Sequence, residues 1–267
     1  MRLYNVSFPG LGINLKINPL ALDLEIIKIN WYGIIIAVSF LAAYLYINSR
    51  AKEFGVDKEK LLDVIICGAF SGIIGARAYY VIFYPGDFYK NNPWRILDIA
   101  SGGIAIYGAI IGGLLGAFII LLYKKMKVWP VFDLAALGLL IGQAIGRWGN
   151  FFNQEAFGTI TRLPWGMMSE NTSNQTVHPC FLYESIWCLI GFLILHVYSK
   201  NKKERPDGEI FCLYVLWYGL GRTFIEGLRT DSLMIPFLGL RVSQLVAILS
   251  CLVASMVLIK IIKSKTY

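Results

Sequence analysis

Residues 103–123 read GIAIYGAIIGGLLGAFIILLY, a run without a single charged side chain. A helix needs about 20 apolar residues to cross the ~30 Å hydrocarbon core of a bilayer. Across the whole chain 57% of the residues are hydrophobic and 16% are charged, whereas about 25% are charged in ordinary soluble domains. The chain is therefore predicted to be an integral membrane protein.

Six further apolar stretches of similar length lie on either side of this run. The seven predicted spans are about 29–49, 62–84, 103–123, 131–147, 181–199, 209–226 and 243–262. We expect an all-α integral membrane protein with seven transmembrane helices, because helices satisfy their own backbone hydrogen bonds in lipid. Residues 1–267 are expected to form a single polytopic membrane domain, with a loop region at the outer face over residues 148–179.

The basic residues orient these spans. Most of the 25 Lys and Arg lie in residues 50–60, 124–127, 200–205 and 260–265. Short loops rich in Lys and Arg remain in the cytoplasm, so the N-terminus is predicted to be outside and the C-terminus cytoplasmic. Despite the net charge of +8, nucleic acid is not an expected partner, because no basic stripe is interleaved with aromatic residues.

Small residues recur at four-residue spacing inside the spans, a pattern that favours close packing of membrane helices. They are Gly68 and Gly72, then Gly108, Gly112 and Gly116, then Gly138, Gly142 and Gly146. The five cysteines stand singly without a CxxC spacing, and His178 and His196 are the only histidines. Neither a metal site nor a disulfide framework is therefore expected.

Ionisable side chains inside or beside hydrocarbon are costly, so each is a functional candidate. The candidates are Arg77, Asp133, Arg147, Glu155, Glu184, Arg222 and Glu226. For Arg77 and Asp133 we expect a structural role, as a charge pair or as side chains that snorkel to the interface.

Two constellations of these residues point to a phosphate. The segment 146–158 places Arg147 and Glu155 beside two Asn side chains and three glycines. Arg suits bidentate phosphate recognition, and glycine lets the backbone come close to a ligand. Tyr218, Arg222 and Glu226 are spaced i, i+4 and i+8, which puts them on one helix face. The second arginine either serves the same anionic headgroup or forms a purely structural pair with Glu226.

The pattern GRxGNFxNxExxG, read from Gly146 to Gly158, resembles the signature of the prolipoprotein diacylglyceryl transferase family. Further matches run along nearly the whole chain. They include Trp31-Tyr32-Gly33, Gly102-Gly103, His178-Pro179, Leu182-Tyr183-Glu184, Tyr218 to Arg222, Glu226, Arg229 and Ser243-Gln244.

The resemblance implies transfer of the diacylglyceryl group of phosphatidylglycerol to the lipobox cysteine of prolipoproteins. A thioether would form and glycerol 1-phosphate would leave, at the bacterial cytoplasmic membrane, as the first step of lipoprotein maturation. The implied partners are phosphatidylglycerol, prolipoprotein signal peptides with a lipobox, and membrane lipid. No cofactor and no metal is implied, and the nucleophilic thiol belongs to the substrate.

The resemblance also implies roles for individual residues. Arg222, Tyr107 and Glu155 would act in catalysis. The residues implied in substrate binding are Arg147, Asn150, Gly158, Tyr32, Tyr218 and Glu226.

One position departs from the family pattern. Many members carry a histidine in the run HGGxxG or HGAxxG, where this chain reads Tyr107-Gly108-Ala109-Ile110-Ile111-Gly112. A free tyrosine has a pKa near ~10 and is a poor base at neutral pH. The identity of the general base is therefore left open, as are the acyl-chain preference, the range of lipoprotein substrates and the oligomeric state.

Two other classes of protein also place charges in a membrane. An anion transporter or channel predicts inverted repeats, and no repeat is evident between the halves of this chain. A metal-dependent phosphotransferase of the CDP-alcohol type needs a cluster of aspartates to hold its metal, which these residues do not supply.

Overall fold

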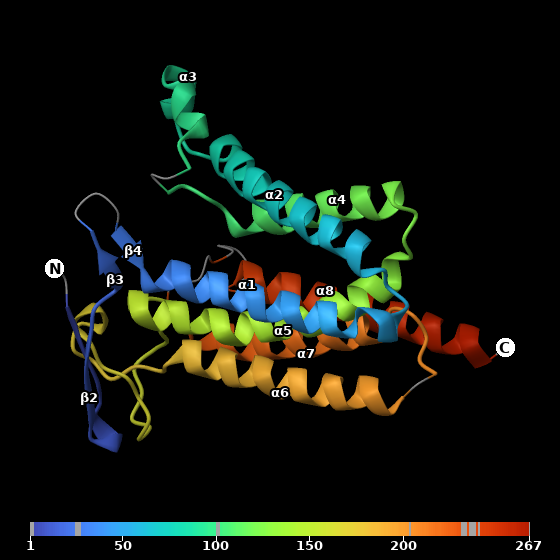
Figure 1. Ribbon diagram of the computed structural model, residues 1–267. Coiled ribbons are helices and arrows are strands. Elements are labelled where there is room, and N and C mark those ends of the chain that lie inside the picture. The colour runs from blue at the N-terminus through green and yellow to red at the C-terminus, as the bar shows by residue number, and fades with distance from the viewer. Residues whose placement is uncertain are drawn as a thin grey trace. The chain divides into compact units, whose positions relative to one another are not determined.

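The computed structural model is mostly helical (Figure 1) and describes residues 3–24, 28–99, 102–202, 204–230, 234, 239 and 241–266. The α-helices are α1 Trp31–Arg50, α2 Lys58–Ile82, α3 Phe88–Asn91, α4 Ile106–Tyr123, α5 Val128–Asn153, α6 Cys180–Asn201, α7 Glu209–Leu228 and α8 Val242–Thr266. Short 3-10 helices are η1 Pro9–Leu11, η2 Ala51–Phe54, η3 Pro93–Leu97 and η4 Glu170–Thr172. The strands β1 Tyr4–Phe8 and β2 Ile13–Ile17 form one antiparallel pair, and β3 Leu20–Asp23 and β4 Lys28–Asn30 form another.

Six of the helices in the described part of the chain are long and apolar enough to cross a membrane, namely α1, α2, α4, α5, α6 and α8. Each coincides with a predicted span, so the prediction of a mostly helical, multi-pass membrane architecture is confirmed. The predicted span at 209–226 forms α7, which carries Glu209, Arg222 and Glu226 and is not among these six helices. The count of seven spans and the orientation of the termini stay predictions.

The chain forms two compact units. The first comprises residues 1–49 and 132–267, and the second comprises residues 50–131. The expectation of a single polytopic domain over 1–267 stays a prediction, and the two units are described separately below.

In the second unit α2 and α4 run side by side in contact through their glycines (Figure 1). A Cβ added to Gly75 would lie 2.4 Å from the carbonyl oxygen of Gly108. A Cβ added to Gly112 would lie 2.4 Å from the carbonyl oxygen of Ser71. The predicted role of the α4 glycines in close helix packing is confirmed, because any larger side chain at these positions would force the helices apart.

Arg77 closes the connection between the same two helices. Its Nε donates to the carbonyl of Ile96 at 2.9 Å, and its Nη1 donates to Gly102 and Gly103 at 2.8 Å each. Its Nη2 donates to the carbonyl of Arg95. The structural role expected for Arg77 is confirmed, with backbone carbonyls as its partners.

Asp133 has a structural role in the first unit. Its side chain is buried, its Oδ2 accepts the N–H of Gly208 at 2.7 Å, and its Oδ1 accepts the N–H of Phe211 at 2.8 Å. These donors stand at the start of α7, where the first N–H groups of a helix have no partner within the helix. Asp133 on α5 therefore caps α7 and ties the two helices together.

The β1–β2 hairpin and residues 154–179 form a small cap over the end of α5 and the start of α6 (Figure 1). Ser7 and Met168 exchange backbone hydrogen bonds at 2.9 and 2.8 Å. The shared core of the cap comprises Tyr4, Val6, Ile17, Phe151, Met167 and Phe181. The strands β1 and β2 were not predicted, because each is only five residues long and Pro9 and Gly10 stand between them.

The α2–α4 contact leads to a prediction about stability. We expect Gly75→Ala to lower the free energy of unfolding by about 1–3 kcal/mol, the usual cost of overpacking, because its Cβ would overlap the backbone of α4. Gly68→Ala on the same helix is the matched control, since its Cβ would lie 3.4 Å from the nearest atom. Thermal unfolding in detergent compares the two variants. Equal unfolding temperatures would contradict the close contact of α2 and α4 at Gly75.

Candidate functional site

A cluster of charged side chains joins three helices of the first unit. Glu184 on α6 lies at its centre and is only 5% exposed. Its Oε2 is 2.5 Å from Nη2 of Arg147 on α5, and its Oε1 is 3.1 Å from Nη1 of Arg222 on α7. Nη2 of Arg222 lies 2.7 Å from Oε2 of Glu226. One buried carboxylate thus holds two arginines from different helices.

Arg229, directly after the end of α7, completes the group that we call the arginine–glutamate cluster. Its Nη1 lies 3.7 Å from Oε1 of Glu184, and its Nε lies 3.9 Å from Oε2 of Glu226. Among the described residues, the cluster joins three arginines to two glutamates, a formal charge of +1 for these five side chains. The arginine side chains are 13–21% exposed, so the excess charge lies where water screens it weakly. The cluster is therefore suited to bind an anionic group.

Helix geometry explains how the sequence assembles this cluster. Arg222 and Glu226 are spaced i, i+4 on α7 and share one face. Helix α5 continues to Asn153, beyond the predicted end at 147, so Arg147 is held within a helix and not in a loop. The structure brings Arg147 and Arg222 together through Glu184, and Arg222 also pairs with Glu226. That the two arginines serve one anionic headgroup stays a prediction.

A polar column lies one and two turns before the cluster, and sequence reasoning missed part of it. Tyr218 on α7 stacks on Tyr214, with ring centroids 5.9 Å apart. Gln143 on α5 donates its Nε2–H to the hydroxyl of Tyr214 at 3.0 Å. Gln143 precedes Arg147 by four residues, as Tyr214 precedes Tyr218. That spacing is the sequence signal that would have identified both residues.

Asn150 and Glu155 meet at the end of α5. Oε1 of Glu155 accepts hydrogen bonds from the side-chain amides of Asn150 at 2.9 Å and Asn153 at 3.3 Å. The Tyr32 ring lies against the same end of α5, because a Cβ on Gly149 would be 2.8 Å from its Cδ2. Asn150 follows Arg147 by three residues and so lies on the same helix face. The predicted residues Tyr32, Asn150 and Glu155 thus gather beside the arginine–glutamate cluster.

Gly158 occupies a crowded crossing point in the cap. Its N–H donates to the carbonyl of His178 at 2.9 Å, and it pairs with Arg229 in an antiparallel β-bridge. A Cβ at this position would lie 2.8 Å from both Cys180 Sγ and His178 Cβ. Gly158 is therefore needed where the chain passes close to Arg229, and the predicted contact of Gly158 with a headgroup stays a prediction.

His178 is a polar residue of the cap that sequence reasoning gave no role. Its Nδ1 is hydrogen-bonded to the hydroxyl of Tyr183 at 3.1 Å, and Trp165 donates its Nε1–H to the same hydroxyl at 2.9 Å. Burial lowers the pKa of His178 below its ordinary value, which favours the uncharged imidazole at neutral pH. The only sequence signal was its place in the His178-Pro179 match, six residues before Glu184.

Tyr107 is the second residue of α4, half-buried, and belongs to the second unit. Its predicted catalytic role is not tested by the geometry of the first unit and stays a prediction. Within the described ranges, no group of three or more His, Cys, Asp or Glu side chains is arranged to hold a metal ion.

The fold and the site define a multi-pass helical membrane protein with a largely buried cluster of arginines and glutamates. A family model described as "Prolipoprotein diacylglyceryl transferase" matches residues 19–260. The chain belongs to this family, as the sequence resemblance indicated.

Two relatives show the extent of the similarity. The chain is 45% identical over 249 residues to the phosphatidylglycerol–prolipoprotein diacylglyceryl transferase of Listeria monocytogenes serotype 4a (strain HCC23), which covers 90% of this chain and 88% of the relative. It is 43% identical over 248 residues to the protein of the same name from Staphylococcus aureus (strain Newman), which covers 89% and 87% respectively.

The central place of Glu184 can be tested through stability. Breaking a buried ion pair by removing one partner typically costs about 3–5 kcal/mol. We expect Glu184→Gln to lower the free energy of unfolding by that order, because Arg147 and Arg222 lose a shared counter-charge. Glu209→Gln is the matched control: Glu209 is equally buried, but its partner Lys202 is 41% exposed, so the loss should be smaller. Urea or thermal unfolding measures the loss of stability in both variants. A larger loss in Glu209→Gln than in Glu184→Gln would contradict the central place of Glu184.

Proposed function

We propose that this protein transfers the diacylglyceryl group of phosphatidylglycerol to the lipobox cysteine of a prolipoprotein. The observation that supports the proposal is the buried carboxylate of Glu184, which pairs with both Arg147 and Arg222. The relatives, which are named for this reaction, supply the substrates. The reaction would be the first step of bacterial lipoprotein maturation.

The chemistry fits the charges of the site. The thiolate sulfur of the lipobox cysteine attacks the methylene carbon of the diacylglycerol half that carries the phosphate oxygen. A carbon–sulfur bond forms, the carbon–oxygen bond breaks, and glycerol 1-phosphate leaves with the bonding electrons. Negative charge therefore grows on the phosphate, where preorganised cationic donors are most effective.

The arginines can serve carboxylate and phosphate together. A guanidinium carries five N–H donors in a planar fork, and the contacts of Arg222 with Glu184 and Glu226 fix its plane. We assign the leaving phosphate to Arg222 and the lipid headgroup to Arg147, with Tyr218 and Glu226 orienting Arg222. Asn150, Tyr32 and Glu155, at the end of α5, are placed to contact the hydroxyls of the glycerol headgroup. The reaction needs no dissociable cofactor.

The proposed setting is the bacterial cytoplasmic membrane, with α7 as the seventh span and the cap on the outer side. The basic loops support this orientation. In a Cys-free background, an impermeant thiol reagent added to intact cells should label Gln175→Cys in the cap and spare Glu204→Cys. The opposite labelling pattern would overturn the orientation.

Mass analysis of a lipobox peptide incubated with the purified protein and phosphatidylglycerol tests the reaction directly. We expect a diacylglyceryl mass increment from the wild type and a loss of about 10²–10³ in rate for Arg147→Ala or Arg222→Ala. Lysine at either position should restore little, because a point charge does not match the planar fork.

Arg162→Ala is the matched control, since Arg162 is an exposed arginine of the cap and should leave the rate unchanged. Absence of the increment with the wild type would contradict the proposed function. Near-normal turnover in either alanine variant, at normal protein levels, would remove that arginine from the mechanism.

For Tyr107 we propose a positioning role, in which its hydroxyl hydrogen-bonds a substrate or a water. Tyrosine and neutral histidine can each donate one hydrogen bond, so Tyr107→His should keep useful activity. Tyr107→Phe should lose roughly 10- to 100-fold in rate. Rate–pH profiles of both variants provide the measurement. If the Phe variant falls to the no-enzyme background while it still binds lipid, Tyr107 takes part in the proton transfer instead.

A further inference from the structure

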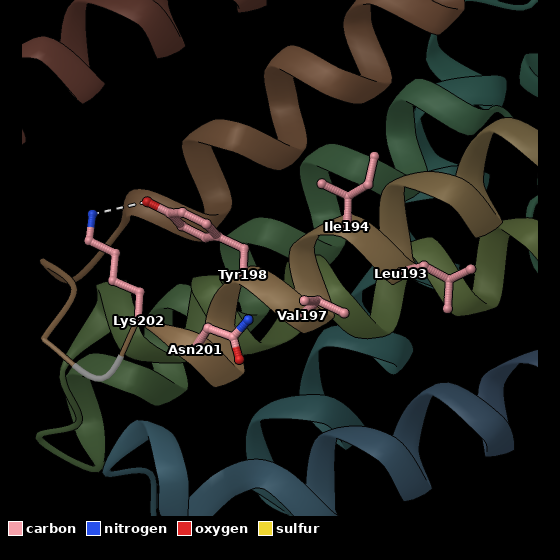
Figure 2. Close-up of a pocket in the computed structure, with 6 residues that line it drawn as sticks. All are labelled: Leu193, Ile194, Val197, Tyr198, Asn201 and Lys202. Atoms are coloured by element: carbon pink, nitrogen blue, oxygen red, sulfur yellow. Dashed lines mark hydrogen bonds between the residues drawn. The ribbon is translucent and has the colours of Figure 1, made fainter.

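A groove lies along the C-terminal end of α6, away from the arginine–glutamate cluster. Its volume is about 840 Å³. Figure 2 shows its lining, which is apolar toward the helix middle and polar toward the helix end. The lining residues are Leu193, Ile194, Val197, Tyr198, Asn201 and Lys202.

The length of the groove matches one leaflet of a bilayer. Residues 193–202 rise about 14 Å along the helix at ~1.5 Å per residue, which is close to half of the ~30 Å hydrocarbon core. Leu193, Ile194 and Val197 are about half exposed on a helix that is long and apolar enough to span the membrane. An acyl chain fits such a surface along its whole length.

The polar end of the groove carries a fixed cation. Nζ of Lys202 lies 2.9 Å from the hydroxyl of Tyr198 (Figure 2). It also lies 2.8 Å from Oε1 of Glu209. An ammonium group has three donors, so these two contacts leave one for a ligand. The hydrogen bond with Glu209 raises the pKa of Lys202, which keeps it charged. The sequence around it, residues 200–205, holds four basic residues and one acidic residue.

We propose that this groove binds an anionic phospholipid, with an acyl chain along Leu193, Ile194 and Val197 and its phosphate at Lys202. The site goes beyond the proposed reaction. Lys202 follows Glu184 by 18 residues in the sequence, a rise of about 27 Å along α6, so the lipid belongs to the leaflet opposite the arginine–glutamate cluster. Through Lys202 and Glu209 the lipid would hold the end of α6 to the start of α7.

Photo-crosslinking in a bilayer tests the site. The full-length protein carries benzoylphenylalanine in place of Val197 and is reconstituted in vesicles of three parts phosphatidylcholine to one part phosphatidylglycerol. Mass spectrometry of the adducts should find phosphatidylglycerol enriched about fivefold over its share of the bilayer, the effect of one basic residue near an anionic surface. The same probe in place of Leu189, which is exposed on α6 outside the groove, should give adducts in the lipid ratio of the vesicles, here called the bulk ratio.

Two further variants separate this site from the reaction. Lys202→Gln should return the adducts at position 197 to the bulk ratio, whereas Lys202→Arg should keep the enrichment. Arg147→Ala should also keep it, because the substrate site is a different one. A bulk ratio at position 197 in the parent protein would overturn the proposal, as would crosslinking to a second copy of the chain. If the enrichment of phosphatidylglycerol persists in Lys202→Gln, the proposal that Lys202 binds the phosphate is wrong.

Discussion

The carboxylate of Glu184 is the constraint on which the site depends. A buried charge without a partner costs far more than a paired one, so Arg147 on α5 and Arg222 on α7 must reach the same point on α6. Two features support this contact. Helix α5 continues to Asn153, and the Asp133 carboxylate accepts a hydrogen bond at the start of α7. Gly158 pairs with Arg229 in a β-bridge, at a point where a Cβ would crowd Cys180 and His178.

The excess of arginine over glutamate connects this constraint to the chemistry. Equal numbers of arginines and glutamates would hold the helices together without a net positive charge. The third arginine makes the cluster positive, and partial burial keeps that charge effective. In the proposed reaction, the same groups that join α5, α6 and α7 would stabilise the phosphate as its negative charge grows.

The sequence predicted the helical spans well because uncharged runs such as 103–123 have one favourable environment, a bilayer. It also singled out Arg147 and Arg222 as functional candidates, since ionisable groups are rare in such runs. The β1–β2 hairpin was not predictable, because its stability comes from Phe151, Met167 and Phe181 far along the chain. Glu184 was recognised as a candidate, but its place between two arginines depends on how three helices pack. Helix spacing alone does not contain that information.

A double-mutant cycle tests most directly whether the cluster acts as one unit. It compares Arg147→Ala, Glu184→Ala and the double variant for the free energy of unfolding and for the rate of diacylglyceryl transfer. Residues within one ion-pair network typically show coupling of about 0.5–3 kcal/mol. The account predicts that the double variant loses less than the sum of the two single losses, by at least ~1 kcal/mol. Losses that add to within about 0.3–0.5 kcal/mol, as for independent sites, would contradict it.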